Sequence, residues 1–214
     1  MWILAGATEI DQLARSGAIV PEQPRPHLRI VKGKFAGRHL TSPADKRVRP
    51  TAEPVRDAVL TLLEPELKGA RILDLFAGTG ALGLEAISRG AKTADFVEFR
   101  PASLHALKAN VAALHLLERT RIFKKDAVPF TALLEADRYD IAFCDPPFES
   151  KVLDRILEMW RATPFARILV AEHATSHVLH SGSMRKKFGD VSVTIYKSTR
   201  SEKREARSAK DESS

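Results

Sequence analysis

The sequence predicts an α/β protein with a doubly wound, mostly parallel sheet, preceded by a small basic β-hairpin. Strand-type and helix-type segments alternate from residue 71 to residue 196, a pattern typical of a parallel sheet with helices on both faces. A glycine-rich turn at residues 76–83 joins the first of these strands to its helix. Two β-prone runs separated by Gly33 and Gly37 predict the hairpin. The length of 214 residues fits one domain with a substantial core.

The individual elements follow from local patterns along the chain. Apolar residues at helical spacing predict a helix that begins at Glu53, and Pro65 is expected to end it. Gly90 lies where a helix C-terminal glycine is expected, and Pro101 lies in the favoured first turn of a helix that runs to about Leu114. The other helices are expected around 82–87 and 153–160, and the strands at residues 71–75, 94–97, 121–123, 139–144, 168–171 and 191–196.

The positive charge of the chain is concentrated in one short stretch. The net charge is +7, and residues 25–49 hold eight Lys or Arg against Asp45 alone, which leaves 26 basic and 26 acidic residues elsewhere. A concentrated basic patch can contact several phosphates of a polyanion, so this stretch predicts a nucleic-acid partner. A solvated basic face without a partner is the alternative. The candidate phosphate contacts are Arg29, Lys32, Lys34, Arg38, Arg47 and Arg49.

Composition excludes several other classes of protein. The single cysteine, Cys144, permits neither an intrachain disulfide nor a cysteine-based zinc site. A membrane-spanning helix needs roughly 20 consecutive apolar residues, and no stretch approaches that length. The apolar start of the chain lacks a basic leader and ends at Thr8, so it does not predict a signal peptide. We therefore expect a cytoplasmic protein with an N-terminal extension at residues 1–27 and a disordered charged tail at 199–214.

The glycine-rich turn predicts a ligand site. Gly78, Gly80 and Gly83 satisfy GxGxxG directly after a strand and at the start of a helix. Glycine allows a tight turn and close approach of a ligand, and the helix N-terminus offers free N–H groups. The pattern is shared by nicotinamide and methyl-donor sites, and a plain strand-to-helix turn is the remaining alternative. Asp74 favours a methyl donor, because a carboxylate four residues before Gly78 can meet a cationic group such as the amino end of S-adenosylmethionine.

Further carboxylates follow the next two strands. Glu98 ends the second strand, where an acidic residue can accept hydrogen bonds from ribose hydroxyls. Asp126 follows the third strand and is a candidate acceptor for an adenine amino group. Acids at successive strand ends predict one crevice, although each alone is often only solvated. The predicted cofactor site consists of Asp74, Phe76, Gly78, Gly80, Gly83, Glu98, Asp126 and Ala127.

The loop after the fourth strand carries the strongest signal for chemistry. It reads Asp145-Pro146-Pro147-Phe148, in which two prolines rigidify the backbone and remove two N–H groups. The loop therefore presents acceptors, the Asp145 carboxylate and the Pro146 carbonyl, to a group with two N–H donors such as an exocyclic base amine. Accepting those hydrogens can orient the amine lone pair for attack on a methyl sulfonium. Phe148 offers a face on which the base can stack. A structural Pro-Pro turn is the alternative.

Together these segments resemble a known family. Asp-Leu-Phe-Ala-Gly-Thr-Gly with Asp-Pro-Pro-Phe is similar to the S-adenosylmethionine-dependent methyltransferases that act on exocyclic nitrogens. The runs 29–38, 49–51, 55–56 and 74–86, together with 145–148, narrow this to the bacterial small-subunit ribosomal RNA guanine-N2 methyltransferases of the D type. The resemblance extends from about residue 28 to about residue 197.

The resemblance implies a Rossmann-like, seven-stranded methyltransferase sheet over residues 49–198 and an RNA-binding hairpin over 28–48. It implies that S-adenosylmethionine is the cofactor and that a guanine N2 in small-subunit (16S) ribosomal RNA, free or in the assembling subunit, receives the methyl group. Asp145, Pro146 and Phe148 would be the catalytic residues, and the base would be unstacked to reach them. We expect a monomer with no metal and no membrane partner.

Other readings remain open. Adenine N6 and a protein glutamine amide also present an sp² nitrogen, and a nucleic-acid-binding protein with a degenerate cofactor site is a rival from another class; a nicotinamide oxidoreductase is more distant. His173, His177 and His180 have helical spacing beside Glu172, which predicts a polar loop or helix face ahead of a metal site. Cys144 is expected to pack in the core rather than act as a nucleophile. Arg49 and Arg56 are expected either to contact substrate phosphate, to organise the site, or to be merely solvated.

Overall fold

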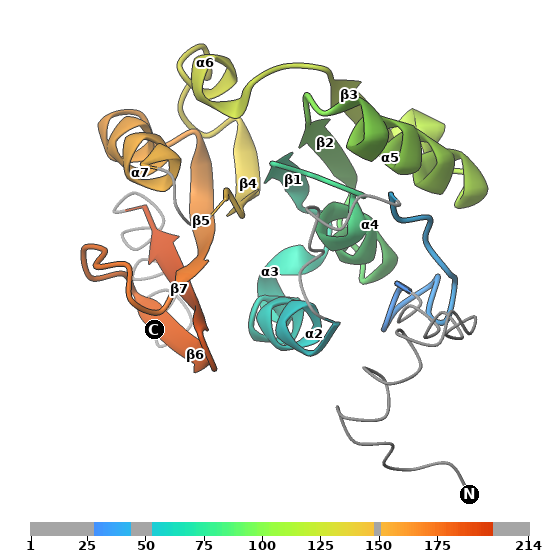
Figure 1. The fold of residues 1–214 in the computed structure, drawn as a ribbon, viewed down its shortest axis with the longest axis horizontal. Coiled ribbons are helices and arrows are strands. Elements are labelled where there is room, and N and C mark those ends of the chain that lie inside the picture. The colour runs from blue at the N-terminus through green and yellow to red at the C-terminus, as the bar shows by residue number, and fades with distance from the viewer. Residues whose placement is uncertain (1–27, 44–52, 148–150, 199–214) are drawn as a thin grey trace, which may run out of the picture.

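The computed structural model describes residues 28–43, 53–147 and 151–198. They form a seven-stranded sheet in the order β3-β2-β1-β4-β5-β7-β6 (Figure 1). The strands are β1 (Arg71–Leu75), β2 (Thr93–Val97), β3 (Thr120–Phe123), β4 (Tyr139–Cys144), β5 (Ala166–Ala174), β6 (Met184–Phe188) and β7 (Val191–Lys197). The first five strands are parallel, whereas β7 runs antiparallel to both β5 and β6. The predicted doubly wound, seven-stranded architecture is confirmed.

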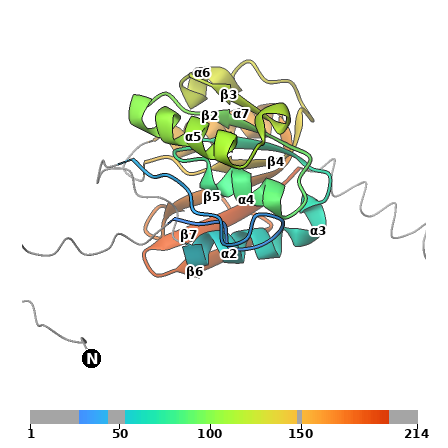
Figure 2. The same cartoon turned by 90° about the vertical axis from the view of Figure 1, so that its right-hand side faces the viewer.

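Helices cover both faces of this sheet. They are α2 (Glu53–Leu62), α3 (Glu64–Leu67), α4 (Ala81–Ser88), α5 (Pro101–Ala113), α6 (Ala127–Thr131) and α7 (Val152–Ala162), with a 3₁₀ turn at Leu117–Arg119. One core cluster joins α2, α4 and α5 to one side of the strands, and a second joins α6 and α7 to the other (Figures 1 and 2). Neighbouring residues of β1 divide between the clusters, with Ile72 in the first and Leu73 in the second, because successive side chains of a strand point to opposite faces.

The structure contains three elements that the local patterns did not predict: β6, the short helix α3 and the short helix α6. Strand β6 was not predicted, because its sequence MRKKF has no apolar alternation and all five side chains are exposed or partly exposed. It lies at the sheet edge and pairs with β7 alone, so it has no buried face to impose a pattern. Pro65 was expected to end the helix that begins at Glu53. The helix α2 instead ends at Leu62, and Pro65 lies in the first turn of α3, where proline costs no hydrogen bond.

The segment before α2 forms the predicted β-hairpin only in a short form, as a turn closed by one antiparallel bridge. Arg29 and His39 make a single antiparallel bridge, and the Leu40 N–H donates to the Leu28 carbonyl at 2.7 Å. The turn is anchored on α4, because the Lys34 N–H donates to the Ser88 carbonyl at 2.8 Å. Residues 44–48 of the predicted hairpin, the extension 1–27 and the tail 199–214 lie outside the described residues. In the part of the chain that is described, no helix is long and apolar enough to cross a membrane.

Candidate functional site

The candidate site lies where the strand order reverses between β1 and β4. Chain order places β2 and β3 on one side of β1, and β4 and β5 on the other. In open parallel sheets, ligands bind outside the carboxyl ends of the strands at such a switch point. The predicted residues Asp74, Glu98, Asp126 and Asp145 lie at or just after the ends of β1 to β4. The topology therefore brings them to one edge of the sheet.

The glycine turn adopts a backbone that needs glycine. Gly78 and Gly80 have φ values of +55° and +78°, in the left-handed region, and Phe76 also has a positive φ of +63°. A Cβ at Gly83 would lie 2.5 Å from Cε1 of Phe96, so only glycine lets α4 approach β2 this closely. A Cβ at Gly78 would instead meet no atom closer than 3.9 Å. The turn is therefore packed tightly against the sheet at Gly83, whereas the described residues leave the space beside Gly78 empty, with room for a ligand.

Asp74 is a buried carboxyl beneath this turn. Its side chain is 3% exposed, and its Oδ2 accepts the Gly83 N–H at 3.0 Å. The pKa of Asp74 is raised from its usual value of 3.8 to about 7, mainly by burial and in addition by the charges of Asp145 and Glu98, against the lowering effect of the Gly83 hydrogen bond. Because neighbouring carboxylates repel its ionised form, this edge of the sheet is a region of negative potential.

Glu98 fastens the turn to the second strand. Its Oε2 accepts the Gly78 N–H at 2.9 Å, and its Oε1 accepts the Phe99 and Arg100 N–H groups at 2.8 Å each. The side chain is buried, at 2% exposure. The carboxylate thus holds three backbone donors of the turn and of the next loop, and its predicted hydrogen bonds to ribose hydroxyls would be additional to these.

Asp126 and Ala127 lie at the end of β3, farther from the turn in sequence. The Asp126 Oδ1 accepts the Val128 N–H at 2.9 Å and so caps the N-terminus of α6. Its side chain is exposed, while Ala127 is buried in the second core cluster. The structure gives Asp126 a capping role that sequence reasoning did not identify, and its contact with an adenine amine stays a prediction.

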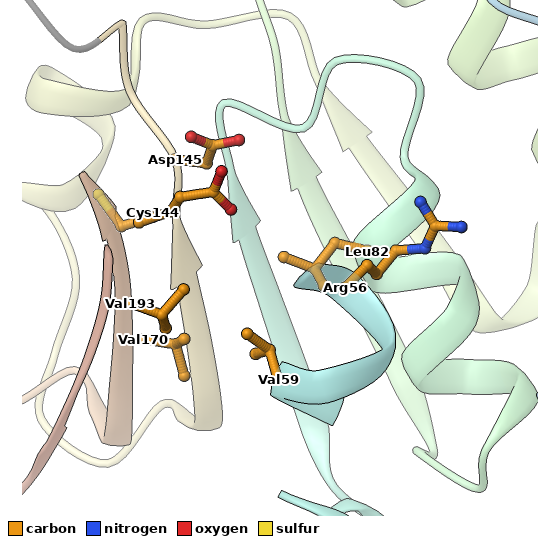
Figure 3. Close-up of a pocket in the computed structure, with 8 residues that line it drawn as sticks. Arg56, Val59, Leu82, Cys144, Asp145, Val170 and Val193 are labelled. Atoms are coloured by element: carbon orange, nitrogen blue, oxygen red, sulfur yellow. The ribbon is translucent and has the colours of Figure 1, made fainter. Parts of the chain in front are cut away.

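A small pocket that opens to solvent lies beside Asp145. Asp145 is partly buried, Pro146 is buried and Pro147 is exposed, while Phe148 lies outside the described residues. Figure 3 shows the Asp145 carboxylate at one end of the pocket, with three valines toward the other end. The lining residues come from α2, α4, β4, β5 and β7: Arg56, Val59, Leu82, Cys144, Asp145, Val170, Glu172 and Val193. Sequence reasoning missed Glu172 as a lining residue, because only the neighbouring strand places it there.

The described residues fit a cationic cofactor at the turn. Asp74, Glu98 and Asp145 make a field that disfavours a further negative charge and favours a positive one. The open side of Gly78 leaves room for a ligand against the backbone. The sulfonium and ammonium groups of S-adenosylmethionine match these acidic side chains, whereas an anionic ligand would be repelled by them.

Four predicted RNA-binding residues lie exposed on the turn before α2, and three of them also contact the protein. The Arg29 Nε lies 3.3 Å from Glu53, and the Lys32 Nζ lies 2.9 Å from Asp57. Arg38 donates to the Ala113 carbonyl at 3.0 Å. Lys34 is exposed, with its Nζ 5.4 Å from the centre of its neighbouring Phe35 ring. Arg47 and Arg49 lie outside the described residues.

Arg56 organises the site from within. Its side chain is 0% exposed, and its Nε donates to Glu85 at 2.7 Å. Its Nη2 donates to the Arg29 carbonyl at 2.5 Å, so it ties the basic turn to α2 and α4. Figure 3 shows the guanidinium directed away from Asp145. Of the sequence-based alternatives for Arg56, the structure supports the organising role and contradicts a solvated one.

The histidine cluster and the cysteine take structural roles. His173 lies in β5, whereas His177 and His180 lie in the loop that follows it, so the three histidines do not share one helix face and two of them have the predicted loop position. Its Nε2 lies 2.9 Å from the Thr194 hydroxyl, and burial lowers the pKa of its ring. No group of three metal-ligating side chains occurs among the residues that the structure describes. Cys144 is buried in the second core cluster, and burial raises the pKa of its thiol, which confirms the packing interpretation.

Comparison with known proteins gives relatives over most of the chain. A family model described as conserved hypothetical protein 95 matches residues 28–197. YlbH of Bacillus subtilis, named provisionally as an rRNA methyltransferase, is 30% identical over 183 residues, which are 79% of this chain and 98% of that protein. Ribosomal RNA small subunit methyltransferase D of Escherichia coli K12 is 36% identical over 132 residues, 62% of this chain and 66% of that protein. A solved Escherichia coli structure, named provisionally as the methyltransferase yhhF, has a TM-score of 0.70 at 30% identity and covers 80% of this chain and 98% of its own.

Proposed function

Because this chain belongs to the family described as conserved hypothetical protein 95, we propose that it transfers a methyl group from S-adenosylmethionine to small-subunit ribosomal RNA, with the exocyclic N2 of a guanine as the acceptor. The observation that carries this proposal is the position of Asp145 between the glycine turn and the pocket. A group held at the turn and a base held in the pocket would meet at this carboxylate. The relatives named as rRNA methyltransferases support the same activity.

One group of residues is proposed to bind the cofactor. Asp74, Glu98 and the turn from Phe76 to Gly83 bind the cofactor through a negative field and an open backbone. Asp126 and Ala127, which follow β3 at the start of α6, are proposed to border the same site. S-adenosylmethionine, when bound, supplies an activated methyl group on a sulfonium, so no metal is required for the transfer.

The Asp-Pro-Pro-Phe loop binds and orients the base amine that receives the methyl group. The Asp145 carboxylate and the Pro146 carbonyl accept the two N2 hydrogens, which turns the amine lone pair toward the methyl carbon. In this proposal the amine nitrogen would form a bond to the methyl carbon while the carbon–sulfur bond of the donor breaks, and the electron pair of the carbon–sulfur bond would stay on sulfur. The amine nitrogen then loses one proton to Asp145 or to solvent. Phe148 stacks on the base in this proposal, and the base is unstacked from the RNA to enter the pocket.

The basic turn binds the RNA. Residues 28–48 are proposed as the RNA-binding segment and residues 49–198 as the methyltransferase domain. The exposed cations of the described part lie on a segment fixed to α4 and α2 through Ser88 and Arg56. RNA phosphates held there would therefore be fixed relative to the pocket. We further propose that the protein acts as a monomer in the cytoplasm, where small subunits assemble.

The test uses labelled S-adenosylmethionine and small subunits that lack the modification. After incubation with the protein, nucleoside analysis of the ribosomal RNA should show N2-methylguanosine at one position. Label in N6-methyladenosine would overturn the choice of base, and label in protein would overturn the choice of RNA. If S-adenosylmethionine binds in calorimetry but no label is transferred to RNA or protein, the proposed activity is wrong.

A further inference from the structure

A second carboxylate lies beside Asp145 in the pocket and has no part in the mechanism above. In the parallel pairing of β4 and β5, Cys144 is opposite Ala171. The next residues on these neighbouring strands are Asp145 and Glu172, and both line the pocket. Glu172 also pairs with Val193 of β7, and it is partly buried. Backbone pairing on both sides therefore fixes the position of Glu172 relative to Asp145.

The rest of the pocket is lined mainly by apolar side chains. Val59, Leu82, Val170 and Val193 present hydrocarbon walls. The Arg56 guanidinium is bound to Glu85 and to the Arg29 carbonyl, and it points away from Asp145. Hydrogen-bonding groups that could read a base in this pocket are thus mainly acceptors. An acceptor-lined pocket selects a ligand edge that carries donors.

Guanine and adenine differ on that edge. Guanine presents N1–H directly beside its N2 amine, which makes two neighbouring donor groups. Adenine presents its amine beside N1, which carries a lone pair and no hydrogen. A carboxylate beside Asp145 would attract the guanine N1–H and repel the adenine N1 lone pair.

We propose that Glu172 selects guanine by accepting its N1–H while Asp145 holds the N2 amine. This inference rests on the proposed methyl transfer to a base amine and adds to it the residue that chooses the base. Glu172 acts here as a specificity-determining residue, because the bond made and broken involves only the amine that Asp145 orients. Its loss should change the choice of base more than it changes cofactor binding.

The test compares two bases in the same RNA. The methylated position is first mapped, and small subunits are then reconstituted with either guanine or 2-aminopurine at that position. The second base keeps the 2-amine but has an acceptor at N1 in place of the N1–H. The wild-type protein should prefer guanine in kcat/KM by about 10- to 100-fold, the range for one good base contact.

The E172Q variant should reverse the preference for guanine over 2-aminopurine, because that preference depends on the group at N1. The glutamine amide can donate to the N1 lone pair of 2-aminopurine, so kcat/KM should fall for guanine and hold or rise for 2-aminopurine. We expect the ratio of the two values to shift by about 100-fold or more toward 2-aminopurine. An unchanged ratio, with both substrates equally affected, would assign Glu172 a structural role and overturn the inference.

Two further variants and one measurement keep the result interpretable. E172D keeps the carboxylate and should retain the guanine preference even if its rate falls, which serves if E172Q does not fold. E158Q removes a glutamate from the exposed side of α7 and should leave the ratio unchanged. Calorimetric affinity for S-adenosylmethionine should be the same in all variants. If the wild-type protein labels no guanine, the proposed function itself fails; if it labels guanine and E172Q keeps the ratio, only the role of Glu172 fails.

Discussion

Replacing Asp74 with asparagine should stabilise the unliganded protein above pH 7 while weakening its affinity for S-adenosylmethionine. Burial disfavours the ionised form of this carboxyl, and the charges of Asp145 and Glu98 add to the effect. Asparagine has nearly the same shape and keeps an oxygen that can accept the Gly83 N–H, now found at 3.0 Å from the Asp74 carboxylate. The substitution therefore removes a charge and leaves the packing of the turn in place.

The sign and size follow from the pKa. In the folded protein the pKa of Asp74 is about 7, above the usual value of 3.8 that applies to the unfolded chain. Below pH 3.8 both states are protonated and there is no penalty. As pH rises toward 7 the unfolded carboxyl ionises first, so wild-type stability falls, and above pH 7 the penalty levels off at about 4 kcal/mol. The advantage of the asparagine variant should then grow by about 3 kcal/mol between pH 5 and pH 8.5.

Urea unfolding at several pH values measures this advantage directly. Exposed Asp126 supplies the control, because Asp126→Asn removes the same charge and keeps the cap of α6. The difference between Asp74→Asn and wild type should widen with pH, whereas the difference between Asp126→Asn and wild type should not. A stability difference for Asp74→Asn that is constant with pH, or an asparagine variant that is less stable than wild type at pH 8.5, would refute the reasoning. Calorimetry on the same samples reports the loss of cofactor affinity.

Three further outcomes test other parts of the molecule. Asp145→Ala should abolish methyl transfer to small subunits while S-adenosylmethionine still binds in calorimetry, and near-normal turnover would remove the carboxylate from the mechanism. Gly33→Ala should lower the free energy of unfolding by about 1–3 kcal/mol, because Gly33 has φ +88° and its Cβ would lie 2.1 Å from the Ser88 carbonyl oxygen. Gly37→Ala, at φ +80° with no atom within 4 Å, should cost less, and equal costs would mean that contact with α4 is unimportant. The combined charge reversal of Lys32→Glu, Lys34→Glu and Arg38→Glu should weaken RNA binding in filter assays. It should also reduce the slope of log affinity against log salt concentration by about 2–3. An unchanged slope would mean that the basic turn does not contact the RNA.

Local patterns in the sequence were sufficient for the parallel part of the sheet and for the glycine turn. The buried strands are apolar runs in the sequence because helices cover both of their faces. Gly78 and Gly80 are required by the left-handed backbone of the turn itself, whereas Gly83 is required by its packing against Phe96. Strand β6 could not be found in this way, because an exposed edge strand has no buried face. His173 alone departs from the predicted loop or helix face, because it lies in β5, where residues two apart share a face.

The sequence by itself determined the parallel strands with the longer helices between them, the turn beneath which Asp74 is buried and the position of Asp145 after a strand, since each depends on residues close together in the chain. The tertiary structure decided which distant side chains meet. Pairing of β4 with β5 brings Glu172 beside Asp145, and packing of α2 against α4 buries Arg56 on Glu85. These contacts join residues 27 and 29 positions apart, and no local pattern specifies them, because strand pairing and helix packing are set by the whole core. The basic stretch of the sequence likewise gained its place in the molecule only from its anchoring on Ser88 and Arg56.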